Sequence, residues 1–515
     1  MLNRKKLLKG AAAIGAGLMT AVLISAAGAV LGPTSKPRPY DGRVRPETSD
    51  TSIGGDFDTT PIGTYEIETT ITELELAPGV VVSARIRAPI DAGEGLPAVV
   101  FLHGAGTQDS LGFTLQAEAL ASAGIVSVVA EKRQDNYSVK SRDYIGSAAD
   151  YHRGVDLARS LPQVDPDRVG IYAESEGAYI APVLASEYED VAFVVLVSAP
   201  VVPPRLQGTY AVHTYLTETH VPPDLFRLIP RALGAEFPFG WMADYLDFDP
   251  QEYQQRITQP VLVVFGTGDH SMPQAQGTSQ IRADIAVAGN DAFTARFYEG
   301  ANHGIRIGDG TGPLAPHFAE DLARWINGLP ESATAGPEVA GAVANQPIWA
   351  DPPDRPPALL SGNLLVVTHA IPPVVLLVGA GTGVAAAVRA VRRRRRGLTV
   401  EGVHRLPVLL GASGVLAVAT WYIWINYVGD IAELALSYQQ DPDVTFGGYR
   451  TENQVALASA FTLGVAGFHW IHGARKGARL STLGRVAAVS TAVGTAGLLV
   501  LASYWSGFPT FGWGS

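Results

Sequence analysis

The sequence predicts two kinds of structure: an α/β domain with a mostly parallel sheet and helices on both faces, and an all-α transmembrane region. Two observations predict them. Between residues 64 and 330, short uninterrupted apolar runs alternate with helical patterns, which is typical of strands buried on both faces of a parallel sheet. Outside that range, five uncharged runs are each long enough to cross a hydrocarbon core of about 30 Å.

Composition agrees with this division. The chain has 515 residues, too many for one ordinary core, and its 47% apolar and 17% charged content is typical of a membrane protein. A net charge of −11 argues against general nucleic-acid binding. Because the chain has no cysteine, a disulfide framework and a cysteine-based metal or redox site are excluded.

Residues 1–33 predict an N-terminal signal sequence. The basic stretch 3–6 precedes an uncharged run over 11–33, which reads either as a signal peptide cut near Ala27 to Ala29 or as an uncleaved signal anchor. The length of the run favours the anchor, and both readings export the residues after it. Residues 34–63 are rich in Pro, Gly, Ser, Thr and Asp and predict a linker; residues 331–357 predict a second one.

The α/β domain is predicted over residues 64–330. An alternating pattern over 65–69 and 80–87 predicts antiparallel opening strands. Buried strands are predicted at 98–102, 125–130, 169–172, 191–197, 261–265 and 295–298, and helices at 115–123, 148–160 and 318–329. Residues 198–259 are too long for a simple connection, so they predict a cap insertion over the mouth of an active site.

A four-helix transmembrane region is predicted over residues 358–515. Its spans lie at about 359–388, 406–428, 455–473 and 486–507. Basic residues fall in two loops, which should be cytoplasmic together with the N-terminus; they are Arg389, the arginines from 392 to 396, Arg405, Arg475, Lys476, Arg479 and Arg485. Residues 34–357 then lie outside the cytoplasm. The same arrangement places one group of aromatic residues at the outer interface: Trp421, Tyr422, Trp424, Tyr427, Tyr504 and Trp505.

Ser175 is the candidate nucleophile. An apolar run from 169 stops at this serine, which is flanked two positions away by the small residues Ala173 and Gly177. The pattern predicts strand, sharp turn and helix, an arrangement that projects the serine hydroxyl above the edge of a sheet. Taken alone, the same pattern also fits an ordinary loop after a buried strand.

Two further residues complete a possible triad. Asp269 directly follows the predicted strand at 261–265, and His303 lies in a loop of small residues after the last predicted strand. The order Ser175, Asp269, His303 is the order known for strand-turn-helix nucleophiles, with Asp269 orienting the His303 base. His270 competes as the base, but a neighbour of Asp269 on the same loop cannot easily place that carboxylate behind its own ring.

Backbone N–H groups are expected to stabilise a developing oxyanion. The candidates are Glu176, just after the nucleophile, and Ala105, in the loop after the strand at 98–102. His103 is predicted to hold that loop through its ring nitrogens. Glu174 and Glu176 could disfavour anionic substrates or bind an amine, although solvated carboxylates are the favoured reading.

Several of these motifs resemble a known family. The runs Phe101-Leu102-His103-Gly104-Ala105-Gly106, Ser175-Glu176-Gly177 with 179–182, and 191–196 are similar to α/β-hydrolases, in particular to esterases related to dienelactone hydrolases, acyl-CoA thioesterases and prolyl-oligopeptidase-type domains. The resemblance covers about half the chain. It implies Ser175 as nucleophile, Asp269 as acid and His303 as base, with Ala105 and Glu176 as oxyanion donors. Ala173 and Ala178 stand where glycine is commoner.

The sequence therefore predicts a membrane-anchored serine hydrolase that cleaves a small-molecule or lipid ester or thioester outside the cytoplasm. This chemistry requires no metal and no organic cofactor. The protein is expected to contact membrane lipids and not to bind nucleic acid. The sequence does not indicate a protein partner. Acyl transfer to a lipid or cell-wall alcohol and peptide hydrolysis are alternatives within catalysis. A membrane scaffold or transport component with a binding-only hydrolase domain is the alternative outside it.

Overall fold

The structure is a computed structural model that describes residues 4–42, 44–242, 245–308, 310–395, 405–437 and 439–510. These residues form two compact units. The sheet unit comprises Pro37–Ala211 and Trp241–Pro352, and the helical unit comprises Met1–Lys36, Val212–Gly240 and Pro353–Ser515. Residues 1–3, 396–404 and 511–515, on which parts of the predicted basic segments and of the C-terminal region fall, lie outside the described residues.

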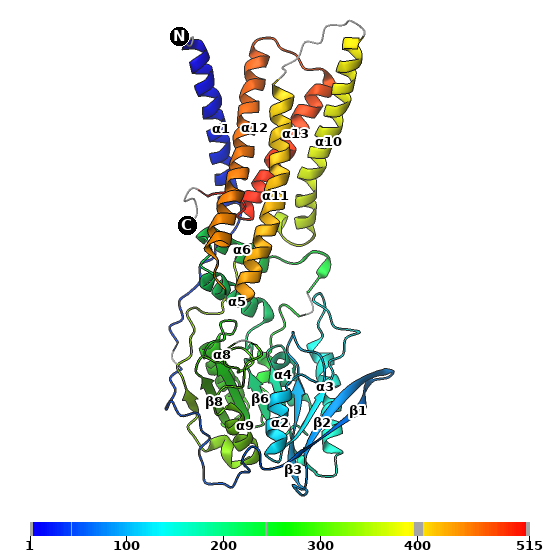
Figure 1. Ribbon diagram of the computed structural model, residues 1–515, viewed down its shortest axis with the longest axis vertical. Helices are drawn as coiled ribbons and strands as arrows, with labels where there is room; N and C mark the ends of the chain where they lie inside the picture. The colour runs from blue at the N-terminus through cyan, green and yellow to red at the C-terminus, as the bar shows by residue number, and fades with distance from the viewer. Residues whose placement is uncertain are drawn as a thin grey trace. The chain divides into compact units, whose positions relative to one another are not determined.

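A nine-stranded sheet forms the centre of the sheet unit, with the order β1-β2-β4-β3-β5-β6-β7-β8-β9 (Figure 1). The strands are β1 (Ile67–Ala77), β2 (Val80–Pro89), β3 (Leu96–Leu102), β4 (Val126–Ala130), β5 (Val164–Glu174), β6 (Val194–Val197), β7 (Val261–Gly266), β8 (Phe293–Tyr298) and β9 (Val339–Gly341). β2 runs antiparallel to both β1 and β4, and all the other neighbours are parallel. The predicted fold class, an α/β-hydrolase fold with antiparallel opening strands, is confirmed.

Helices cover both faces of this sheet. They are α2 (Thr114–Ser122), α3 (Tyr144–Arg159), α4 (Gly177–Glu187), α8 (Gln274–Val287) and α9 (Phe318–Asn327). α2 and α9 share one buried cluster with alternate side chains of β3, among them Val99 and Phe101. α3 covers the opposite face, where a Cβ on Gly154 would lie 2.9 Å from Val100 Cγ1. The central strands are buried on both faces, which explains their continuous apolar sequences.

Two segments predicted to be linkers differ from that expectation, because both pack within the sheet unit. β9 lies in the second segment and adds a parallel strand next to β8. In the first segment, Ile53 is buried in the core, and the carbonyl of Thr51 accepts a 2.6 Å bond from Arg296 Nε. The buried Arg296 also donates to Pro337 O at 3.0 Å. Extended segments of this kind carry no periodic pattern, because their backbone carbonyls supply the contacts.

Among its described residues, the helical unit has five long helices: α1 (Arg4–Val30), α10 (Gly362–Arg395), α11 (Leu406–Leu436), α12 (Tyr449–Arg475) and α13 (Thr482–Tyr504). Each is long and apolar enough to cross a membrane, as predicted. A six-residue π-helix, η5 (Asp443–Gly448), precedes α12. α11 continues past its predicted span, which ended at 428, to Leu436, because the alanines, leucines and glutamate in that stretch favour helix.

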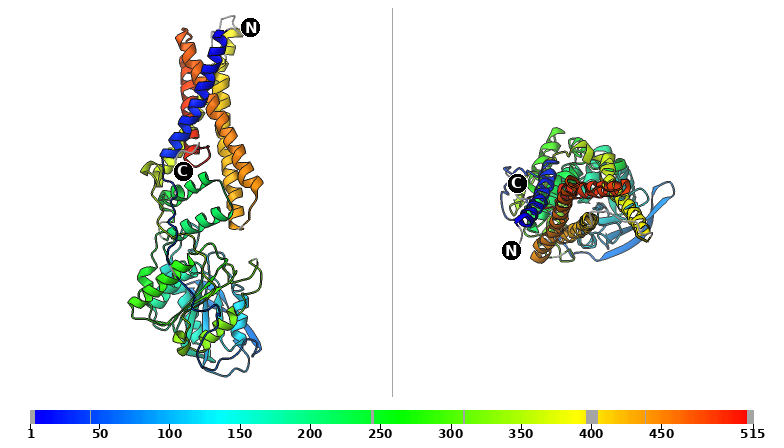
Figure 2. Two further views of the ribbon diagram at one scale, coloured as in Figure 1. Left: turned by 90° about the vertical axis from the view of Figure 1, so that its left-hand side faces the viewer. Right: turned by 90° about the horizontal axis from the view of Figure 1, so that it is seen from above.

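Close contacts between these helices rely on small and polar residues. A Cβ on Gly464 of α12 would lie 2.5 Å from Ala16 O of α1, so glycine permits the two helices to meet. Ser413 of α11 and Ser459 of α12 each donate a side-chain bond to the other's carbonyl, at 3.0 and 2.8 Å. His369 of α10 accepts a 2.7 Å bond from Trp505 Nε1, so this histidine links two helical segments. Figure 2 shows the bundle from the side and from above.

The insertion between β6 and β7 is shared between the two units. It contains α5 (Pro204–Glu218), η1 (Pro223–Arg227), α6 (Leu228–Leu233), η2 (Pro238–Gly240) and α7 (Gln251–Gln254). Its middle part, Val212–Gly240, groups with the helical unit, whereas the sequence assigned the whole insertion to the α/β domain. In the sheet unit, Tyr245 and Phe248 pack edge-on against Tyr144 of α3, at ring distances of 6.2 and 5.1 Å.

Candidate active site

Ser175 lies on a sharp turn between β5 and α4. Its φ is +55°, a left-handed conformation that costs energy for a residue with a Cβ and often marks a functional turn. The turn is held by a bond from Ser175 N to Val197 O at 3.0 Å. Gly177 must lack a side chain, because a Cβ there would lie 2.5 Å from Leu102 O. The predicted strand, turn and helix are therefore present, with the serine at the carboxyl edge of the sheet.

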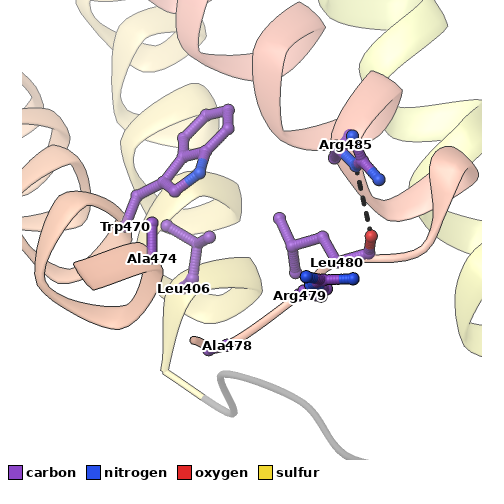
Figure 3. A pocket seen from close by; sticks show the side chains of 7 residues that line it. All are labelled: Leu406, Trp470, Ala474, Ala478, Arg479, Leu480 and Arg485. Atoms are coloured by element: carbon purple, nitrogen blue, oxygen red, sulfur yellow. Dashed lines mark hydrogen bonds between the residues drawn. The ribbon is translucent and has the colours of Figure 1, made fainter. Parts of the chain in front are cut away.

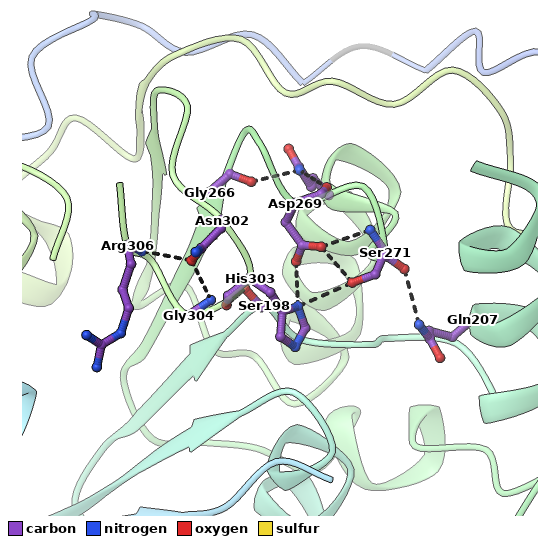
Figure 4. A network of polar contacts seen from close by, with 10 residues as sticks. Ser198, Gln207, Gly266, Asp269, Ser271, Asn302, His303, Gly304 and Arg306 are labelled. Carbon is purple, nitrogen blue, oxygen red and sulfur yellow. Dashed lines mark hydrogen bonds and ion pairs between the residues drawn. The ribbon is translucent and has the colours of Figure 1, made fainter. Parts of the chain in front are cut away.

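Asp269 and His303 meet in a polar network beyond the same sheet edge (Figure 4). His303 Nδ1 donates to Asp269 Oδ2 at 2.8 Å. The Asp269 side chain is fully buried, whereas the His303 side chain is 36% exposed and so is reachable from outside. Since Asp269 binds the ring of His303, the geometry favours His303 over His270 as the histidine that this carboxylate orients.

The electrostatics of this pair follow from burial and mutual charge. Burial lowers the pKa of His303, but the charge and hydrogen bond of Asp269, with a contribution from Glu174, outweigh it and raise that pKa. Burial raises the pKa of Asp269, and His303 together with two bonds from Ser271 outweighs it, so the net pKa is lowered. Burial also raises the pKa of Glu174. The pair therefore favours an ionised Asp269 and makes His303 a stronger base.

Ser271 is a member of this network that the sequence analysis did not single out. Its Oγ donates to Asp269 Oδ1 at 2.6 Å and lies 3.2 Å from His303 Nδ1. Gln274 Nε2 donates to Asp269 O at 2.7 Å, and Gln207 of α5 donates to Ser271 O at 3.1 Å. In the sequence, the one indication of this role was that Ser271 and Gln274 follow the end of β7, as Asp269 does.

Backbone and side-chain bonds connect the Ser175 turn to the His303 loop. Ser175 N bonds to Val197 O of β6, and the next residue, Ser198, donates from Oγ to His303 O at 2.7 Å. Within the described part of the chain, Ser175 Oγ and His303 share no hydrogen bond. Such bonds are often long before substrate binds, so the absence does not remove His303 as the base.

The expected oxyanion donors lie in two neighbouring loops. In the regions that the structure describes, the backbone N–H groups of Ala105 and Glu176 have no hydrogen-bond acceptor, so both are available to a ligand. The loops approach closely: a Cβ on Gly104 would lie 3.1 Å from Ser175 Cβ. Glycine at this position therefore leaves room beside the serine.

His103 has the structural role that the sequence predicted. Its Nε2 bonds to Asp109 O at 2.9 Å and its Nδ1 to Tyr151 Oη at 3.2 Å. Burial lowers its pKa to about 4. The neutral ring thus fixes the loop that begins at Gly104.

The prediction that Glu176 is a solvated carboxylate is wrong, because its side chain is only 4% exposed. Lys132 Nζ donates to Glu176 Oε2 at 2.7 Å and Tyr137 Oη donates to it at 2.6 Å, while Arg142 pairs with Oε1. Lys132 also lies 3.3 Å from Gly104 O. One buried ammonium group therefore ties together the two loops that carry the expected oxyanion donors.

We expect Lys132→Met to lower the free energy of unfolding by about 3 kcal/mol, because removing one partner leaves the buried Glu176 charge undercompensated. Urea denaturation measures the change. The matched control is Arg153→Met: Arg153 pairs at 3.4 Å with Asp156, and the two side chains are 55% and 47% exposed, so a loss below about 1 kcal/mol is expected. Adding Glu176→Gln to Lys132→Met should restore part of the stability. Equal losses in the two single variants would contradict the assignment of Lys132 to a buried pair.

Among the residues that the structure describes, one group of potential metal ligands lies on the surface of the sheet unit. Atoms of His152, Asp156 and Asp190 lie within 4.8 Å of one another. Asp190 is already paired with His152 Nε2 at 3.0 Å and with Arg159 at 3.7 Å. Since these bonds account for the group without an ion, the structure gives no reason to assign a metal there.

Comparisons with known proteins agree with a hydrolase. Residues 150–350 match the family described as BAAT / Acyl-CoA thioester hydrolase C terminal. The chain is 23% identical over 273 residues to Esterase EstD of Thermotoga maritima, an alignment that covers 46% of this chain and 64% of the length of that esterase. These two matches support a hydrolase related to esterases and acyl-CoA thioester hydrolases.

Solved structures that match part of this chain include Est1E of Butyrivibrio proteoclasticus and dipeptidyl peptidase 4 of Porphyromonas gingivalis. The first is 14% identical, with a TM-score of 0.35 over 52% of this chain and 99% of that one. The second is 16% identical, with a TM-score of 0.35 over 51% of this chain and 35% of that one. At these scores the two structures carry no argument about function.

Proposed function

We propose that the chain is a membrane-anchored serine hydrolase that cleaves carboxylic esters or thioesters outside the cytoplasm. Ser175 is the nucleophile, His303 the base and Asp269 the group that orients His303. The observation that carries the proposal is the 2.8 Å bond between His303 and the buried Asp269, at the same sheet edge as a serine in a left-handed turn. Nucleophile, base and orienting carboxylate are the three parts that acyl transfer requires.

The proposed reaction has two halves. His303 Nε2 takes the proton of Ser175 Oγ while this oxygen attacks the substrate carbonyl, and the N–H groups of Ala105 and Glu176 bind the oxyanion. The carbonyl re-forms as the alcohol or thiol leaves with the proton from His303. Water then loses a proton to His303 and attacks the acyl-enzyme, which releases the acid and returns the proton to Ser175.

The insertion is proposed to shape the substrate pocket within the sheet unit. Tyr245 and Phe248 pack on Tyr144, whose Oη lies 3.5 Å from Glu176 Oε1. Tyr144 therefore connects these aromatic rings to the carboxylate of Glu176, the residue that follows the nucleophile in the sequence. Aromatic surface of this kind suits an apolar acyl or alcohol group.

The proposed topology places the N-terminus in the cytoplasm and the sheet unit outside. In Figure 1 the first residues of α1, the last residues of α10 and the connection between α12 and α13 lie at one end of the helical unit. This end carries the basic residues, including Arg389, Arg475 and Arg485. An excess of lysine and arginine in short loops favours the cytoplasmic side.

Labelling of intact cells with a membrane-impermeant fluorophosphonate tests both the nucleophile and the topology. We expect the probe to label the wild-type chain and to leave a Ser175→Ala chain unlabelled at equal expression. If only a permeant probe labels Ser175, the chemistry stands and the topology is inverted. If neither probe labels the wild-type chain, the domain only binds and the hydrolase proposal is rejected.

A further inference from the structure

A cavity of about 350 Å³ opens in the helical unit, where α12 ends and α13 begins. This volume is within the usual range for a small-molecule site, about 300 to 1,000 Å³. Seven residues line the cavity: Leu406, Trp470, Ala474, Ala478, Arg479, Leu480 and Arg485. Figure 3 shows Trp470 and Leu406 on one side of it and the two arginines on the other. The proposed hydrolase chemistry uses none of these residues.

The two arginines give the cavity a positive charge that the described residues do not neutralise. Arg485 Nε donates to Leu480 O at 3.2 Å, which fixes the guanidinium at the cavity wall. Neither Arg479 nor Arg485 forms an ion pair with any described carboxylate. Two guanidinium groups at one cavity provide several planar donors, the arrangement that best binds a phosphate.

The apolar side chains of the lining continue into the core of the bundle. Leu406 is 1% exposed and belongs to one buried cluster with Leu410, against which Trp470 and Leu480 pack. A ligand seated between the arginines would therefore contact hydrocarbon surface with its other end. A small soluble phosphate ester has no apolar group to contact these side chains. A glycerophospholipid has a phosphate for the arginines and methylenes for the apolar side chains.

The surroundings of the cavity also favour an anionic surface. Lys6 of α1 and Arg389, Arg392 and Arg393 of α10 are exposed at the same end of the bundle as the cavity. Each basic residue near an anionic leaflet contributes about 1 kcal/mol of attraction. Trp470 has an amphipathic indole ring, and such rings are enriched at the level of the lipid headgroups.

We propose that this cavity binds one anionic phospholipid, with its phosphate between Arg479 and Arg485 and its glycerol and first methylenes against Leu406, Leu480 and Trp470. The residues combine what basic pockets between membrane helices offer to lipid headgroups: planar donors, an apolar wall and a location at the membrane surface. The cavity lies in the helical unit, and none of its lining residues takes part in the proposed hydrolase chemistry, so the bound lipid is proposed as a structural ligand of that unit.

Native mass spectrometry of the delipidated full chain in detergent, titrated with dioleoyl phosphatidylglycerol, tests the site. For Arg479→Gln with Arg485→Gln we expect the dissociation constant of the first bound lipid to rise at least 10-fold. The matched control is Arg389→Gln with Arg393→Gln, which removes the same charge at the same end but no cavity wall, and a change below 3-fold is expected. Ala474→Trp keeps every charge and fills the cavity, so it should weaken binding about as much as the double arginine variant.

Four outcomes would overturn the proposal. Equal loss in the two double variants would mean general surface attraction. Unchanged binding in Ala474→Trp would mean that the lipid lies elsewhere. Equal affinity for dioleoyl phosphatidylcholine would remove the anionic preference. Displacement of the lipid by millimolar inorganic phosphate would make the cavity a site for free phosphate.

Discussion

A Ser175→Ala variant is expected to lose turnover of a short-chain nitrophenyl ester by roughly 10,000-fold or more while its fold stays intact. The loss is large because the substitution removes the atom that forms the acyl-enzyme, and binding alone supplies little acceleration. The fold should persist because Ser175 Oγ makes no hydrogen bond among the described residues and alanine keeps the Cβ. Initial rates with purified protein measure the first effect, and the thermal unfolding midpoint measures the second.

Ser198→Ala is the matched control for this prediction. Ser198 lies at the end of the neighbouring strand β6, and its Oγ supports the His303 backbone through a 2.7 Å bond to His303 O. We expect a loss of about 5-fold, because one neutral hydrogen bond contributes about 1 kcal/mol and the nucleophile is unchanged. If Ser175→Ala kept more than a tenth of the wild-type rate, the nucleophile would have to be sought at another residue.

The sheet was predictable because its signals are local. The strands β3 and β7 and the second part of β5, residues 169–173, are short apolar runs. The residues just after these runs, including Ser175 and Asp269, are placed by the rule that parallel strands end at one edge. The turn at Ser175 was also predictable, because it needs small neighbours such as Gly177 at fixed offsets. These inferences depend on spacing along the chain and not on distant contacts.

The partners of Glu176 could not be predicted in the same way. Lys132 lies 44 positions and Arg142 lies 34 positions from this carboxylate in the sequence. No periodicity connects them, and a charged residue next to a catalytic serine is most simply read as solvated. The one usable signal was that Lys132 follows the end of β4, at the same sheet edge as Ser175.

The contacts of the insertion with distant segments could not be predicted from the sequence either. Its buried Arg231 has acceptors from both ends of the chain: it donates to Pro33 O at 3.0 Å and to the carbonyl of Tyr504. Asp224 accepts a 2.6 Å bond from Tyr449 Oη and a 2.9 Å bond from Thr510 Oγ1. All these contacts lie within the helical unit. The length of the insertion suggested a cap, because the sequence does not show which distant segments accept hydrogen bonds from Arg231.

Asp269→Asn is expected to lower kcat by about 10,000-fold near neutral pH and to move the acid limb of the pH profile. Asparagine keeps the shape of the side chain, but it no longer holds His303 in the tautomer with the proton on Nδ1. Because kcat depends on neutral His303, activity falls as pH drops through the His303 pKa. Asp269 raises that pKa above its ordinary value, so removing the carboxylate charge should lower the pKa and shift the acid limb to lower pH.

Initial rates of ester hydrolysis from pH 5 to 10 measure both effects. Ser271→Ala is the comparison, because it removes the 2.6 Å bond to Asp269 and leaves both charges in place. That variant should lose about 10- to 100-fold in kcat, since one hydrogen bond to a charged group contributes about 1.5 to 3 kcal/mol and the Nδ1 bond to His303 persists. Its acid limb should stay close to that of the wild type. An acid limb that is the same in Asp269→Asn and wild type would show that His303 is not the base whose titration limits the rate, and His270 would then be the next residue to replace.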